Sequence, residues 1–97
     1  MFYPGEPQEL RNLVEGLLAE VHATAAPAVA AIVPHAGLIY SGSCAAEVFK
    51  RLQLSSTVVI LAPNHTGMLG ARSGASTWRS GTFQTPLGDI SIAAEFV

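Results

Sequence analysis

The chain of 97 residues is long enough for one small domain or for one part of a larger domain. Its formal net charge of -2 argues against a nucleic-acid or anionic-membrane partner, because such partners select a basic surface. Although 49% of the residues are hydrophobic, prolines interrupt the longest apolar run before it reaches the length of a membrane span, and the single cysteine favours a reducing, cytoplasmic setting.

The first predicted element is an amphipathic helix that begins near Glu6 and Pro7 and extends to Val21. Proline is tolerated in the first turn of a helix, and an acidic side chain there favours the positive end of the helix dipole. Apolar residues then follow one face at helical spacing: Leu10, Leu13, Val14, Leu17, Leu18 and Val21. We expect His22, at the end of this helix, to be a surface or capping residue.

Two short apolar runs, residues 29–33 and 57–62, each end in a proline followed by polar residues. Runs of this length, rich in Val and Ile, are typical of buried parallel strands. The segment between them is long enough for the helical crossover that parallel strands require, and we expect that helix near residues 42–53, capped by Ser41 or Ser43. The pattern predicts an α/β core with both strand ends at one edge of the sheet.

The last part of the chain predicts two short strands, at residues 75–78 and 89–93, on either side of a turn. The turn is indicated by Thr85-Pro86-Leu87-Gly88. Before it, Trp78 and Arg79 suit either an aromatic or anionic ligand or a packed rim.

The strongest candidates for chemistry are His35 and His65, one after each apolar run. An imidazole serves as a metal ligand, a general base or a general acid, and the edge where parallel strands end is where open α/β folds bind ligands. The alternative is that each histidine fixes its own loop by a hydrogen bond. Asn64 either orients His65, donates to a substrate oxygen or is a turn residue, and Tyr40 either faces the pocket or packs. For Cys44 we expect burial rather than a reactive thiol.

Four motifs, in this order and at this spacing, resemble the Memo family, which includes the mediator of cell motility and the AmmeMemoRadiSam system protein B of bacteria and archaea. The motifs are Phe2-Tyr3-Pro4, Pro34-His35-Ala36-Gly37 with Tyr40-Ser41-Gly42, Pro63-Asn64-His65-Thr66-Gly67, and Thr85-Pro86-Leu87-Gly88. The resemblance spans essentially the whole chain and corresponds to about the first third of a typical family member.

The resemblance implies an α/β fold similar to the class III extradiol dioxygenases, with a three-layer core and a mainly parallel sheet. Residues 1–97 would then be a single partial domain, truncated on its C-terminal side. His35 and His65 match the first two histidines of the family's metal pocket, which implies iron or copper as the cofactor and both histidines as metal-binding and catalytic residues. Asn64 and Tyr40 would lie on the substrate side.

Three alternatives for the function are considered. The first is a metal-dependent oxidoreductase of dioxygenase type, acting beside a radical-SAM or AMMECR1-type partner protein, with one histidine available for proton transfer. The second is a metal-handling or protein-binding adaptor without turnover. The third is an inactive truncated product. The residues themselves name no substrate.

Overall fold

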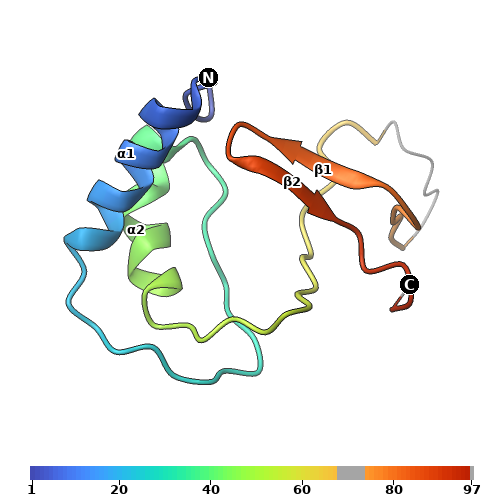
Figure 1. The fold of residues 1–97 in the computed structure, drawn as a ribbon. Coiled ribbons are helices and arrows are strands. Elements are labelled where there is room, and N and C mark those ends of the chain that lie inside the picture. Colours follow the sequence, from blue (N-terminus) through green and yellow to red (C-terminus); the bar gives the residue numbers. More distant parts are fainter. Residues whose placement is uncertain (68–73, 97) are drawn as a thin grey trace. The chain divides into compact units, whose positions relative to one another are not determined.

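The computed structural model describes residues 1–67 and 74–96 of the chain. These residues form two units, Met1–Ser55 and Ser56–Val97, and each is described by itself. The first unit contains both helices and the second contains a hairpin of two strands (Figure 1). The α/β class is confirmed. The single partial domain, the three-layer core and the mainly parallel sheet stay predictions.

Helix α1 (Pro7–Ala19) begins where it is predicted to begin and ends at Ala19, before the predicted end at Val21. Its N-cap is Glu6, whose carboxylate accepts hydrogen bonds from the backbone N–H groups of Gln8, at 3.0 Å, and Glu9, at 2.8 Å. These two bonds satisfy donors that have no partner within the helix. Because they favour the charged carboxylate, the bond from Gln8 first and that from Glu9 second, they lower the pKa of Glu6 from its ordinary value of 4.5.

Helix α2 (Leu38–Phe49) begins four residues before the predicted start at residue 42. The prediction of a serine cap is wrong, because the N-cap is Gly37 and no side chain caps the helix. Ser41 lies inside the helix instead, and its hydroxyl donates to the carbonyl oxygen of Ala36 at 2.9 Å. The first N–H of the helix, on Leu38, donates to the carbonyl oxygen of Phe2 at 2.9 Å. A distant backbone group therefore does what a capping side chain would do.

The two helices lie side by side, and their contact holds the small core of the first unit (Figure 1). The buried hydrophobic residues are Leu10, Val21 and Ala46. Gly42 is also buried, with the Leu17 side chain directly over its Cα. A Cβ atom at residue 42 would come within 2.8 Å of Leu17 Cδ1, so glycine lets the helices approach closely. Among the described residues, neither helix is long and apolar enough to cross a membrane.

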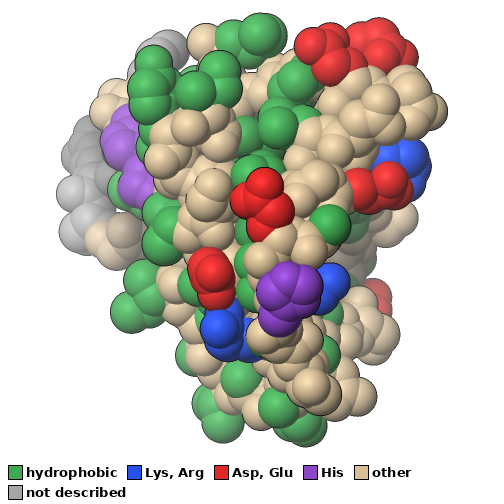
Figure 2. Space-filling view, turned by 90° about the vertical axis from the view of Figure 1, so that its left-hand side faces the viewer, with side chains coloured by type: hydrophobic (Ala, Val, Ile, Leu, Met, Phe, Trp, Pro, Cys, Tyr) green, Lys and Arg blue, Asp and Glu red, His purple; other side chains and the backbone are tan. Residues whose placement is uncertain are grey.

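Residues 29–33 and 57–62, the predicted parallel strands, form no strand in the structure. Many of their apolar side chains are exposed, among them Val29, Ile32 and Leu61. Figure 2 shows hydrophobic side chains at many places on the face that it presents. One parallel bridge does occur, between Ala26 and Leu52, just before the first run and just after α2. Ala26 N–H donates to Arg51, and Gln53 N–H donates to Ala26, both at 3.0 Å. The chain thus returns after α2 in the direction that a parallel crossover requires.

The second unit contains an antiparallel hairpin of β1 (Thr82–Thr85) and β2 (Gly88–Ser91). The predicted turn joins the strands: the Thr85 hydroxyl donates to the carbonyl oxygen of Gly88 at 2.6 Å and accepts from Leu87 N–H at 3.2 Å. Gly88 has a φ of 128°, a conformation that L side chains rarely adopt. The predicted strand at residues 75–78 does not form, whereas the one at 89–93 is formed in part, by β2.

Candidate functional site

His35 lies in the loop that leads into α2, and its side chain is exposed. The backbone on its C-terminal side is held at two points. The Ala36 carbonyl accepts the Ser41 hydroxyl, and the Leu38 N–H donates to Phe2. Gly37, between these points, is buried. The first unit therefore presents the His35 imidazole at its surface, next to a backbone that is fixed on one side.

His65 is exposed in a tight turn of the second unit. Within this turn the Asn64 side-chain oxygen accepts a hydrogen bond from Gly67 N–H at 3.0 Å. Gly67 has a φ of 65°, which suits glycine at the end of such a turn. The structure therefore shows Asn64 in the turn role, which was one of its three alternatives. A role for Asn64 in substrate binding stays a prediction.

Tyr40 is the third residue of α2, and its side chain is 86% exposed. It does not pack into the core of its unit, and its predicted place beside a substrate remains untested. Cys44 is exposed as well, so the expectation that it is buried is wrong. The buried residues of α2 are Gly42 and Ala46. Cys44 is two residues from each of them, which is a rotation of roughly 200° about the helix axis, so it lies on the opposite face of the helix. His22 is exposed, as predicted for a surface residue.

The two candidate metal ligands belong to different units, His35 to Met1–Ser55 and His65 to Ser56–Val97. Their joint action as ligands stays a prediction. Over residues 1–67 and 74–96, the structure contains no group of three or more His, Cys, Asp or Glu side chains that could hold a metal ion.

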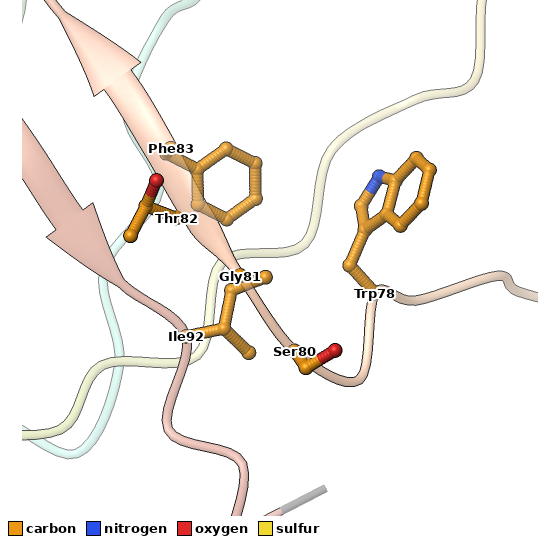
Figure 3. Close-up of a pocket in the computed structure, with 6 residues that line it drawn as sticks. All are labelled: Trp78, Ser80, Gly81, Thr82, Phe83 and Ile92. Atoms are coloured by element: carbon orange, nitrogen blue, oxygen red, sulfur yellow. The ribbon is translucent and has the colours of Figure 1, made fainter.

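Sequence reasoning did not anticipate a pocket of about 290 Å³ beside the hairpin. Its lining residues are Trp78, Ser80, Gly81, Thr82, Phe83 and Ile92. Figure 3 shows the Trp78 and Phe83 rings standing apart across this open space, with Ser80 at its edge. The signal in the sequence was Trp78, named above with Arg79 for a ligand or a packed rim. Trp78 is 62% exposed and lines the pocket, whereas Arg79 is not among the lining residues.

The comparisons with known proteins agree on one family. The family described as Memo-like protein matches residues 1–97. A MEMO1 family protein of Methanopyrus kandleri is 39% identical over 98% of this chain and 37% of its own length. Similar proteins of Aquifex aeolicus and Methanocaldococcus jannaschii are 38% and 39% identical over 97% and 100% of the chain.

The chain corresponds to only part of the length of these relatives. The chain spans 37% of the relatives from Methanopyrus kandleri and Methanocaldococcus jannaschii and 34% of the relative from Aquifex aeolicus. No solved structure matches the chain significantly. Because the family match covers every residue, from the Phe2-Tyr3-Pro4 motif to the end of the hairpin and beyond, the chain belongs to the family of Memo-like proteins.

Proposed function

We propose that this chain supplies two histidine ligands, His35 and His65, to a metal-binding pocket of a Memo-like protein. The observation that carries the proposal is that both imidazoles are exposed in short loops, each of which follows an apolar run ending in proline. Membership of the Memo-like family supports it, since both loops lie within the matched residues. The structure adds that hydrogen bonds hold both loops: Ser41 of α2 donates to Ala36 in one, and Gly67 donates to Asn64 in the other.

The proposal includes a fold similar to that of the class III extradiol dioxygenases. In such a fold the apolar residues 29–33 and 57–62 would pair as parallel strands and bring the two loops to one sheet edge. The parallel bridge between Ala26 and Leu52, within the first unit, supports the crossover, because the chain directly after α2 runs parallel to the segment that precedes the first apolar run. The exposed side chains of Val29 and Ile32 would become buried by the pairing and by cover on both faces.

The two imidazoles of His35 and His65 supply part of the ligand set that a transition metal needs. Imidazole nitrogen suits iron, copper and zinc, and a catalytic site usually has three protein ligands and one open position. We propose iron or copper, with the remaining ligands supplied by the part of a full-length relative that lies beyond this chain's matched region. Such a metal would supply Lewis-acid or redox chemistry. The residues of this chain would hold it through His35 and His65, while Tyr40 and Asn64 would lie on the substrate side.

For the full-length protein we propose a metal-dependent oxidoreductase that acts in the cytoplasm beside a radical-SAM or AMMECR1-type partner. The alternative of a metal-handling protein or adaptor without turnover shares the same ligands but forms no product. Aerobic conversion of a catechol by a full-length relative would favour the oxidoreductase. Stoichiometric metal uptake with no product would favour the alternative.

The proposal is tested by calorimetric titration of Fe(II), Cu(I) and Zn(II) into the chain and into a full-length relative. We expect weak binding to the chain, because two neutral imidazoles leave the metal mostly hydrated, and tight binding to the relative. His35→Ala and His65→Ala each abolish binding to the chain, whereas His22→Ala, which changes an exposed histidine outside both loops, leaves it unchanged. Tight one-to-one binding that survives both loop substitutions would refute the proposal.

A further inference from the structure

The N-terminal residues contact the loop that carries His35 through backbone atoms. Leu38 N–H donates to the Phe2 carbonyl at 2.9 Å, and Gly37 is buried beneath the same segment. A Cβ atom on Gly37 would lie 3.3 Å from the Met1 carbonyl oxygen and 3.4 Å from Phe2 Cα. The side chains of Met1 and Phe2 are 95% and 70% exposed, so they contribute little to this contact.

This contact occupies the beginning of α2, where a helix has N–H groups without partners inside the helix. Gly37 supplies no side chain to cap them. Figure 1 shows the N-terminus at the end of the helix pair where α2 begins. The Phe2 carbonyl therefore takes the place of a side-chain cap, and it fixes the backbone three residues after His35.

We propose that Met1 and Phe2 form a positioning strap for His35. The strap is defined as the backbone of these two residues, from the Met1 carbonyl to the Phe2 carbonyl. It holds Gly37 and Leu38 from one side, while the Ser41 hydroxyl holds Ala36 from the other. With the strap in place, the backbone after His35 has one conformation, and the imidazole samples fewer positions. Insofar as the inference concerns metal affinity, it rests on the proposed function.

A substitution at Gly37 can disrupt the contact with the strap while Met1 and Phe2 stay in the chain. The φ of -54° and ψ of 150° at Gly37 are accessible to any L-residue, so a larger side chain here adds no backbone strain. Gly37→Val instead places methyl groups where the strap lies, since even a Cβ would be at 3.3 Å from it. Gly5→Val is the matched control, because a Cβ on Gly5 has nothing within 4 Å and Gly5 has no positive φ.

The first readout is hydrogen exchange in the 97-residue chain without metal. We expect Gly37→Val, and a chain that starts at Tyr3, to speed exchange of the Leu38 amide at least tenfold. The Lys50 amide, which bonds to Ala46 at the far end of α2, keeps its protection in both. Gly5→Val changes neither amide. Unchanged exchange at Leu38 would overturn the strap, and so would equal loss of protection at Leu38 and Lys50, which would indicate general unfolding.

The second readout is the affinity for Zn(II), followed by the NMR signals of the His35 ring. We expect Gly37→Val to weaken binding about tenfold, as is usual when a group that orients a metal ligand is removed. Unaltered affinity in a variant whose Leu38 amide has lost protection would overturn the positioning role. If the parent chain itself shows no Zn(II) shift at His35, the proposed metal site fails, and the exchange data alone decide whether the strap exists.

Discussion

The close approach of the two helices at Gly42 predicts opposite effects for two matched Gly→Ala substitutions. Gly16 and Gly42 both lie inside helices, α1 and α2, so alanine gains about 1 kcal/mol of helix propensity at each. A Cβ on Gly16 has nothing within 4 Å, whereas a Cβ on Gly42 would lie 2.8 Å from Leu17 Cδ1 and 3.5 Å from Leu38 Cβ. The propensity terms cancel when the two variants are compared.

The remaining difference is the cost of the contact with Leu17. Carbon atoms in van der Waals contact are about 3.5–4.0 Å apart, so the new methyl group overlaps Leu17 by roughly 0.7 Å or more. Leu17 Cδ1 is the end of a flexible side chain and can move, but the core is small and overpacking costs about 1–3 kcal/mol. We therefore expect Gly42→Ala to be less stable than Gly16→Ala by about 1–3 kcal/mol.

The assay is the free energy of opening from native-state hydrogen exchange of amides in both helices, which requires no sharp melting transition. Gly16→Ala should raise protection, and Gly42→Ala should leave it unchanged or lower it. Leu17→Ala removes the clashing atom, so its combination with Gly42→Ala should cost less than the sum of the single effects. If Gly42→Ala stabilises as much as Gly16→Ala does, the helices are not as close as described and the reasoning is wrong.

Three further predictions concern the cap of α1, the hairpin turn and the exposed apolar runs. Since hydrogen bonds from Gln8 and Glu9 lower the pKa of Glu6, the stabilisation by this cap is complete above pH 4.5 and is lost as the pH falls through the lower folded pKa. Circular dichroism should show this loss of helix in acid, and Glu6→Gln, which cannot titrate, should remove that part of the change. An acid titration of Glu6→Gln identical to that of the parent chain would contradict the prediction. Gly88→Ala should lower the exchange protection of β1 and β2, because its φ of 128° strains any side chain, whereas protection equal to the parent's would disprove the turn geometry. With Val29 and Ile32 exposed, the monomeric chain alone should melt broadly by calorimetry, and a sharp cooperative transition would count against this expectation.

The helices and the hairpin turn could be predicted because their signals are local. Helix α1 follows from apolar spacing and an acidic start, and the turn follows from Thr85, Pro86 and Gly88. The start of α2 could not be predicted in the same way, since its capping group is a backbone carbonyl from Phe2, far away in the sequence. No residue preference marks such a cap, and the serines nearby pointed to a later start.

The site could be predicted only as separate residues. His35 and His65 are exposed and their ligand role stays a prediction, whereas the turn around Asn64 follows from its residue types. The exposure of Cys44 was missed because the position of the buried line on α2 is set by Gly42 and Ala46, small residues that carry little hydrophobic signal. The predicted pairing of the two apolar runs stays untested, and the one parallel bridge among the described residues joins Ala26 and Leu52, outside both runs.

The central claim, that His35 and His65 bind one metal ion together, is tested most directly by NMR of the histidine side chains during titration with Zn(II). The account predicts that the ring signals of both residues shift along the same binding curve, with a stoichiometry of one metal ion per chain, while the signals of His22 stay in place. In His35→Ala the response of His65 should disappear, and the reverse should hold for His65→Ala. Independent binding curves for the two rings, or an equal response of His22, would contradict the claim.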